Sequence, residues 1–374
     1  MSRRKIPVAA PVFPGNEKKY ALDCIESTWI SSKGKYISAF EKTFAEFCEV
    51  KHAASVMNGT VALHLALLAL GIEPGDEVII PTFTYVATAN CVAYVGATPI
   101  FVDSEPQTWN IDPEKIEQAI TPSTKAIIVV HIYGHPADMN AIMDIARRYN
   151  LFVIEDAAEA HGAQVNGKTV GSFGNISTFS FFGNKIISTG EGGMVVTNDS
   201  VLYQKVCQLK GQGVDPNRQY WFPIMGYNYR MTNIQAAIGL AQMEKVDWHL
   251  AQRRRVATSY KKYLGEYDSL RLQPELPGYV NSYWMNCILL DESVLQRDMV
   301  IRQLGEYGIE TRPFFHPMHF LPMYKHLCIG RNFPIADQVS AQGINLPSSA
   351  NLTEDDICFI CDSLASVLYN HPIK

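Results

Sequence analysis

Short apolar segments alternate with helical segments between residues 53 and 197, and no other feature of the sequence restricts the fold as strongly. The segment 151–154 is short, β-branched and flanked by polar residues, which is typical of a strand buried on both faces. We expect strands at 53–57, 77–81, 98–102, 125–131, 151–154, 177–182 and 194–197, and helices at 61–70, 84–95, 139–149 and 203–210. This alternation predicts a largely parallel sheet with helices on both faces and with ligands at the carboxyl ends of its strands.

The length of the chain favours two structural units, because 374 residues exceed the size at which a single hydrophobic core stops growing. We expect a large domain at 1–245, which includes the N-terminal segment, and a small C-terminal domain at 246–374. The remaining expected elements are helices at 15–30, 40–48, 294–307 and 354–368, a helical tract broken once at 231–264, and strands at 283–290 and 311–313.

Composition excludes several classes of function. The net charge is −5, with acids and bases interspersed and no basic block, so neither a nucleic-acid groove nor a membrane-surface patch is expected. No apolar stretch approaches the roughly 20 residues of a spanning helix, and the eight cysteines are scattered, so we expect a cytoplasmic protein with reduced thiols. Cys358 and Cys361 form a CxxC within a helical pattern, and His131 and His135 lack the spacing of metal ligands; no metal site is expected.

Asp156 and Lys185 are the two residues that most directly indicate chemistry. Asp156 follows the buried strand at 151–154, whereas Lys185 lies between the aromatic strand at 177–182 and a glycine-rich turn. A lysine in such surroundings is partly desolvated, which lowers its pKa and makes the neutral amine available for Schiff-base formation. A buried aspartate is the partner that a protonated pyridine nitrogen requires. Singly they could be a surface lysine and a helix cap, but together they predict a pyridoxal-phosphate site.

A second anchor for such a cofactor is expected at Asn58, Gly59 and Thr60. These residues form a tight turn between the strand at 53–57 and the helix at 61–70. The exposed N–H groups and the dipole of a helix N-terminus favour an anion, and the Thr60 hydroxyl adds a further donor. We therefore interpret the turn as a phosphate site, although alone it would be an ordinary helix cap.

The segments around Asp156 and Lys185 resemble those of the DegT/DnrJ/EryC1/StrS sugar aminotransferases, a pyridoxal-phosphate family of fold type I. The resemblance covers nearly the whole chain and includes TWISSKG, SFFGNK, GQG followed by RQYW, and GYNYRMTNIQAAIGLAQ, in that order. It implies an α/β fold in which an aspartate-aminotransferase-like large domain, with a mostly parallel seven-stranded sheet, carries a smaller α+β C-terminal domain.

The resemblance also implies roles for residues around the cofactor. Tyr85 would lie flat against the pyridine ring, and Ser180 would hydrogen-bond the phosphate. Glu159 and His161 follow the aspartate closely, so at least one is expected to face the pocket, and the resemblance places Glu159 near the phenolic oxygen. Asn228 would reach the phosphate bound by the neighbouring subunit, which implies a homodimer with shared active sites.

Substrate contacts are expected from three loops. The segment 213–229 interleaves aromatic residues with arginines, which suits stacking on a base and binding of phosphates, although an interface loop would have the same composition. By resemblance, the loop at 29–32 and the FFHPMH loop also face the nucleotide sugar. The expected substrate-binding residues are Trp29, Ser31, Ser32, Arg218, Tyr220, Arg230 and His316.

The activity implied is transfer of an amino group from L-glutamate to C4 of GDP-4-keto-6-deoxy-D-mannose, for O-antigen or other surface polysaccharides. Pyridoxal 5′-phosphate would be the cofactor, and pyridoxamine 5′-phosphate would carry the nitrogen between the half-reactions. Three alternatives stay open: a UDP- or dTDP-linked keto sugar as substrate, a decarboxylation or elimination, and a non-catalytic sugar-nucleotide-binding or regulatory protein. Lysine at position 185 argues against the deoxygenating members of the family, which carry histidine there.

Overall fold

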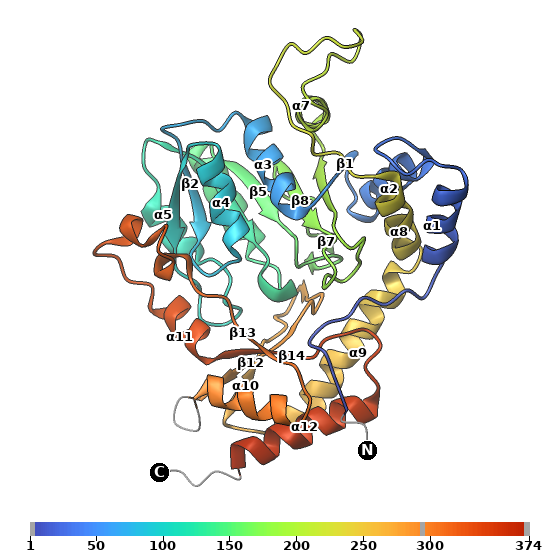
Figure 1. Ribbon diagram of the computed structural model, residues 1–374. Coiled ribbons are helices and arrows are strands. Elements are labelled where there is room, and N and C mark those ends of the chain that lie inside the picture. The colour runs from blue at the N-terminus through green and yellow to red at the C-terminus, as the bar shows by residue number, and fades with distance from the viewer. Residues whose placement is uncertain (1–3, 292–295, 370–374) are drawn as a thin grey trace.

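The structure is a computed structural model that describes residues 4–291 and 296–369 (Figure 1). Its larger part is built on a seven-stranded sheet with the order β1-β9-β8-β5-β4-β2-β3. The strands are β1 (His52–Val56), β2 (Glu77–Pro81), β3 (Thr98–Val102), β4 (Thr124–Val130), β5 (Phe152–Asp156), β8 (Ile176–Ser180) and β9 (Gly193–Thr197). β9 runs opposite to the other six strands of this sheet, so the mainly parallel sheet expected from the sequence is confirmed.

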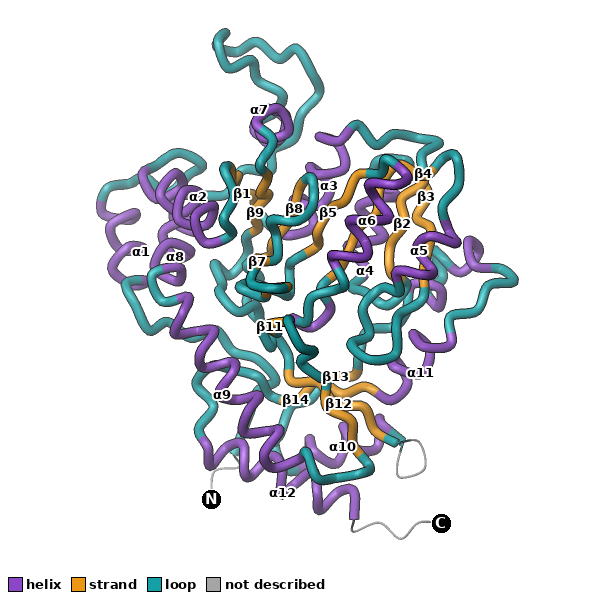
Figure 2. The backbone as a smooth tube through the Cα atoms, turned by 180° about the vertical axis from the view of Figure 1, so that it is seen from behind, coloured by secondary structure: helices purple, strands orange, loops and turns teal. Residues whose placement is uncertain are grey.

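Helices cover both faces of this sheet, as Figures 1 and 2 show from opposite sides. One face carries α3 (Gly59–Leu70), α4 (Val86–Tyr94) and α7 (Ser200–Lys210), and the other carries α5 (Pro113–Ala119) and α6 (Met139–Tyr149). Val153 and Ile154 show why the central strands read as continuous apolar runs. Both are fully buried, but they belong to hydrophobic clusters on opposite faces of the sheet.

Beside β1, three helices form a separate layer: α1 (Glu17–Glu26), α2 (Lys35–Phe47) and α8 (Asn233–Met243). The tract predicted at 231–264 is broken once, as expected, and continues as α9 (Val246–Leu264) toward the smaller part. The helix predicted at 15–30 is shorter than expected. It ends at Glu26 because Thr28 has a φ of 64°, which no α-helix accommodates.

The smaller part contains a four-stranded sheet of order β10-β12-β14-β13 and a hydrophobic core of its own. Its elements are β10 (Leu270–Leu272), β12 (Asn286–Leu290), α10 (Arg297–Glu306), β13 (Arg312–Pro313), α11 (Pro334–Gln342), β14 (Gly343–Leu346) and α12 (Glu354–Tyr369), with short helices η2 (Met318–Phe320) and η3 (Lys325–Cys328). The helix expected at 294–307 is α10, and residues 294 and 295 lie outside the described residues. The division of the chain at residue 245 stays a prediction.

The N-terminal segment pairs with this smaller part. Ile6 forms a parallel bridge with Ile309 and belongs to the core beneath the four-stranded sheet. The Ser348 amide donates to the Val8 carbonyl at 2.8 Å, and the Val8 amide donates to Glu310 Oε2 at 3.2 Å. Residues from the beginning of the chain therefore complete a unit built mostly from its end.

Three further features complete the architecture. A small sheet joins β11 (Tyr279–Val280), β6 (Gln164–Val165) and β7 (Lys168–Thr169), and a short helix, η1 (Ile132–Gly134), follows β4. The CxxC cysteines lie on α12, where Cys361 is buried, so the helical interpretation is confirmed. Over the described residues, no helix has the length and apolar character that crossing a bilayer requires.

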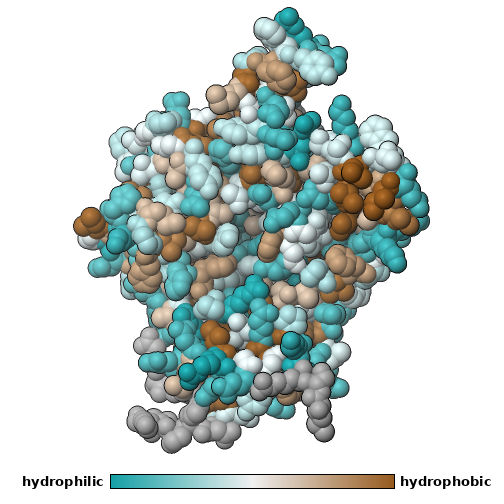
Figure 3. Space-filling view, in the orientation of Figure 1, coloured by the Kyte–Doolittle hydropathy of each residue, from teal (hydrophilic) through white to brown (hydrophobic). Residues whose placement is uncertain are grey.

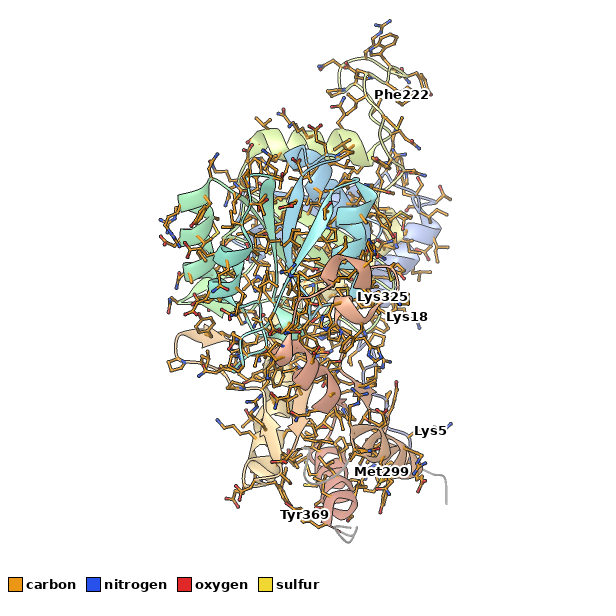
Figure 4. The ribbon with its side chains drawn as sticks, turned by 90° about the vertical axis from the view of Figure 1, so that its left-hand side faces the viewer. Lys5, Lys18, Phe222, Met299, Lys325 and Tyr369 are labelled. Atoms are coloured by element: carbon orange, nitrogen blue, oxygen red, sulfur yellow. The ribbon has the colours of Figure 1, made fainter. Side chains whose placement is uncertain are left out.

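An arm at 211–229 projects from the end of α7 and lies away from the body of the molecule (Figure 1). Figure 4 shows from the side that Phe222 lies on this arm, at the end of the molecule opposite Tyr369. Tyr220 and Met225 on this arm are 81% and 86% exposed, which is unusual for such apolar side chains. The segment that mixes aromatics with arginines is therefore an extended loop rather than part of the sheet.

Candidate active site

A cavity of about 450 Å³ lies where the carboxyl ends of the central strands meet the smaller part. Val130, Asp156 and Ser180 line it from the ends of β4, β5 and β8. The smaller part and the segment leading into it contribute Trp284, Met285, Arg312, Pro313, Phe315 and Asn345. Its volume suits a cofactor or small-molecule site, and its position is where parallel sheets bind ligands.

Eight of the residues predicted from the sequence line this one cavity: Asn58, Gly59, Thr60, Tyr85, Asp156, Glu159, Ser180 and Lys185. They come from two strand ends, two helix starts and the loops after β5 and β8, so the fold brings together residues that are far apart in the chain. Tyr85 immediately precedes α4, and its ring lies 5.7 Å from that of Phe315. Tyr85 therefore brings an aromatic ring to the cavity, and its ring-stacking role stays a prediction.

Asp156 is the last residue of β5, and its carboxyl is buried at the base of the cavity. Thr88 Oγ1 donates to Oδ2 at 2.9 Å, and the Ala158 amide donates to Oδ1 at 3.3 Å. Burial nevertheless raises the pKa of this carboxyl, because desolvation disfavours the charged form. A carboxyl held in this way is strongly stabilised by a cation placed against it, such as a protonated ring nitrogen.

Lys185 follows β8 in a turn, and its side chain is only 11% exposed. Burial lowers the pKa of its amine, the direction expected from the sequence. Nζ lies 3.7 Å from Glu159 Oε1 and 3.7 Å from the centre of the Trp284 ring. The indole N–H donates to the Asn184 carbonyl at 2.9 Å, which fixes the ring beneath the amine.

The sequence did not reveal Trp284. We expected the aromatic surroundings of Lys185 to come from the preceding strand, but Phe179 and Phe181 point into the core instead. The tryptophan arrives from the segment just before β12, and no local spacing relates it to Lys185. Only the packing of the two parts of the molecule against each other brings it to the amine.

The N-terminus of α3 lines one end of the cavity, where the sequence predicts the phosphate site. Asn58 Oδ1 accepts from the Val61 amide at 3.0 Å, whereas the amides of Gly59 and Thr60 lie in the first turn, where no intrahelical acceptor exists. A Cβ added to Gly59 would lie 2.8 Å from the Cβ of Ser180. The glycine therefore allows the helix start and the end of β8 to approach closely. Exposed amides at such a helix start are the donors that the predicted phosphate site requires.

Gly193 on β9 leaves room for this helix start, because a Cβ at position 193 would lie only 2.4 Å from the Asn58 carbonyl oxygen. We expect Gly193→Ala to displace the turn, to lower the free energy of unfolding by about 1–3 kcal/mol, and to weaken cofactor binding. Thermal unfolding and titration with pyridoxal phosphate measure the two effects. Gly305→Ala on α10 is the control, since its Cβ would enter open space and it is not among the cavity-lining residues. Equal cofactor affinity in both variants would contradict this role of Gly193.

Glu159 and His161 face in different directions. Glu159 lines the cavity, where burial raises the pKa of its carboxyl, and its Oε2 accepts from the Tyr133 amide at 2.8 Å. His161 instead packs among aromatic rings on the other side of the segment, including those of Phe179 and Phe181. The expectation that at least one of the pair faces the pocket therefore holds for Glu159.

Burial lowers the pKa of His161 from 6.5 to about 3. Between these values the unfolded chain binds a proton that the folded protein cannot, so this group makes the fold less stable as the pH falls below 6.5. Between about pH 7.5 and pH 5 we expect the free energy of unfolding of the wild type to fall by about 2 kcal/mol more than that of His161→Phe. Denaturant unfolding at both pH values checks this, and equal losses would contradict it.

The predicted substrate residues do not line the cavity within this single chain. Arg218 and Tyr220 are exposed on the arm, and His316 is exposed on the loop after β13. Arg230 forms an isolated bridge with Val56 beside the helix start, and Asn228 forms one with Gly211 at the base of the arm. Trp29, Ser31 and Ser32 occupy the loop between α1 and α2. The binding roles assigned to these residues stay predictions.

The residues of the cavity fit pyridoxal 5′-phosphate: an anion site at α3, a buried carboxyl for the ring nitrogen, and a desolvated lysine for the aldehyde. Fold and site together define a pyridoxal-phosphate enzyme of fold type I. Residues 14–365 match the DegT/DnrJ/EryC1/StrS aminotransferase family, and the chain belongs to this family.

Curated relatives extend over almost the whole chain. GDP-perosamine synthase of Caulobacter vibrioides is 55% identical over 367 residues, which are 97% of this chain and 98% of the relative. GDP-perosamine synthase of Escherichia coli O157:H7 is 52% identical over 359 residues, with 96% and 97% covered. A solved structure, the PLP form of the putative sugar aminotransferase Spr1654 from Streptococcus pneumoniae, superimposes with a TM-score of 0.92 at 25% identity and covers 98% and 99% of the two chains.

Proposed function

We propose that this chain transfers the amino group of L-glutamate to C4 of GDP-4-keto-6-deoxy-D-mannose, giving GDP-perosamine and 2-oxoglutarate. The observation that carries the aminotransferase chemistry is the convergence of Asp156, Lys185 and the α3 N-terminus on one cavity. The GDP-linked substrate is supported by the two GDP-perosamine synthases that are 52–55% identical over nearly the full chain.

The cofactor, when bound, supplies an electron-withdrawing ring that stabilises negative charge on the reacting carbon. Asp156 keeps the ring nitrogen protonated, because its buried carboxyl gains most from a positive partner. The Gly59 and Thr60 amides, in the first turn of α3, would hold the phosphate. Nζ of Lys185 takes the proton from the α-carbon of glutamate and, in the second half-reaction, delivers a proton to C4 of the sugar. Burial lowers the pKa of this amine and so favours its basic form.

Absorbance of the cofactor-loaded protein tests this function. Glutamate should convert a band near ~410 nm to one near ~330 nm, and a GDP-linked 4-keto-6-deoxy sugar should restore the first band. If only a UDP- or dTDP-linked sugar restores the first band, the aminotransferase activity is kept but the substrate carries a different nucleotide. If glutamate causes no change, the aminotransferase proposal is wrong.

We further propose a homodimer in which Asn228 of each subunit serves the cofactor phosphate of the other. Two exposed apolar surfaces support an association: the arm with Tyr220 and Met225, and the face of α1 with Leu22 and Ile25, where Figure 3 shows apolar side chains gathered. Each surface would be covered by a second copy of the chain.

Subunit mixing tests the shared site, because Lys185→Ala and Asn228→Ala damage different components of it. A mixed dimer of the two variants has one site with both residues intact, so mixing should restore up to about a quarter of wild-type activity. No recovery in mixtures shown by sedimentation to contain dimers would contradict the shared site.

A further inference from the structure

The charges of the cavity leave one cation without a role in the chemistry described so far. Among the described residues that line it are three acids, Asp156, Glu159 and Glu191, and two cations, Lys185 and Arg312. On the proposed function, both substrates are anions: glutamate carries two carboxylates and the nucleotide sugar a diphosphate. Lys185 is buried against Glu159, so the guanidinium of Arg312 is the cation available to meet an incoming anion.

Glu310 orients the guanidinium of Arg312 but uses only some of its hydrogen-bond donors. Its Nε and Nη2 donate to the same oxygen of Glu310, Oε1, at 3.3 and 3.0 Å. The other oxygen of Glu310 accepts from the Val8 amide, so the carboxylate that orients the arginine is itself anchored. A guanidinium has five N–H donors, of which two serve Glu310. The side chain lines the cavity and is 48% exposed, so further donors are accessible to a ligand.

Asn345 lies directly opposite Arg312 in the pairing of β13 with β14, and both residues line the cavity. The Asn345 side chain is buried, and its Oδ1 accepts from the Cys287 thiol at 3.2 Å. Pro313 restricts the backbone next to Arg312 to an extended conformation, which keeps the arginine in the strand. A fixed amide and an oriented guanidinium therefore stand side by side at the wall that the smaller part contributes.

We propose that Arg312, with Asn345 beside it, is a specificity-determining residue that binds an anionic oxygen pair of a substrate, either a carboxylate of the amino donor or the diphosphate of the nucleotide sugar. Arginine matches both groups, because its planar fork can donate two parallel hydrogen bonds to two oxygens. This inference deepens the proposed function and rests on it.

The test uses cofactor-loaded protein and two probes, glutarate for the carboxylate source and GDP for the diphosphate source. Calorimetric titration should show that Arg312→Gln binds one probe about 10- to 100-fold more weakly, with a matching rise in the KM of glutamate or of the nucleotide sugar and little change in kcat. Arg312→Lys, which keeps the charge but loses the fork, should fall between Arg312→Gln and the wild type.

Arg271→Gln is the matched control, because Arg271 is an exposed arginine on β10, the opposite edge strand of the same sheet. If Arg312→Gln, but not Arg271→Gln, binds glutarate more weakly than the wild type does, Arg312 binds the amino donor. If Arg312→Gln, but not Arg271→Gln, binds GDP more weakly, Arg312 binds the nucleotide sugar. Unchanged affinity for both probes in Arg312→Gln, or an equal loss in the control, overturns the proposal. The wild-type absorbance assay with the GDP-linked sugar is independent of this result, so failure of the proposed function would be seen separately.

Discussion

Replacing Lys185 with alanine is expected to lower transamination by at least about 10³-fold, because no other amine among the described residues lines the cavity to move the proton. The loss should affect both half-reactions, since the same Nζ serves the glutamate carbon and the sugar carbon. Single-turnover absorbance measurements, one with glutamate and one with the keto sugar, follow the two steps separately.

Lys168→Ala controls for removal of a positive charge, because Lys168 is exposed on β7 and is not among the cavity-lining residues. It should keep the activity of the wild type. Full transamination by the Lys185→Ala protein would remove this lysine from the mechanism, whereas loss of only one half-reaction would show that a second base serves the other.

Asp156→Asn is expected to produce the second large effect, a fall in kcat of about 10²–10³-fold. The asparagine preserves the size of the side chain. Its Oδ1 can still accept from the Ala158 amide, and its NH2 group can donate to Thr88 Oγ1, but the neutral amide cannot stabilise a positive ring nitrogen. Steady-state rates and the absorbance of the bound cofactor measure the effect, and unfolding experiments show whether the fold is kept.

Thr88→Val separates the charge of the aspartate from its positioning. It removes the 2.9 Å hydrogen bond to Oδ2 while leaving the carboxylate in place. We expect a loss of about 10-fold, since one hydrogen bond to a charged group contributes about 1.5 kcal/mol. A loss as large as that of Asp156→Asn would mean that orientation, not charge, is what the aspartate supplies.

Much of the larger part of the fold was predictable from local sequence. The bounds of β2, β3 and α6 match the expected ranges residue for residue, because each element is delimited by its own signals. For α6 these are the Asp138 cap at the start and Asn150, with a φ of 53°, at the end. For the same reason, the cavity-lining positions at strand ends, such as Asp156 and Ser180, and at the start of α3 were predictable from the sequence.

The remainder depends on contacts between distant segments. The short helix α5 and strand β14 were not expected, and the strand predicted from residue 283 begins only at Asn286, because Tyr283 has a φ of 50°. The cavity wall made by Trp284, Arg312 and Asn345 was likewise missed. Nothing in the local pattern of these residues indicates a ligand, and they reach the cavity only because the smaller part packs over it.

The pairing of the first residues with the smaller part has a consequence for the order of folding. During synthesis, Ile6 and Val8 leave the ribosome long before Ile309, Glu310 and Ser348, with which they pair, have been made. The large sheet is complete once β9 has emerged, so it can fold first, as early segments generally do. The N-terminal segment must stay unpaired until the smaller part has been made. Its late docking closes a contact of very long sequence separation, which is slow to form.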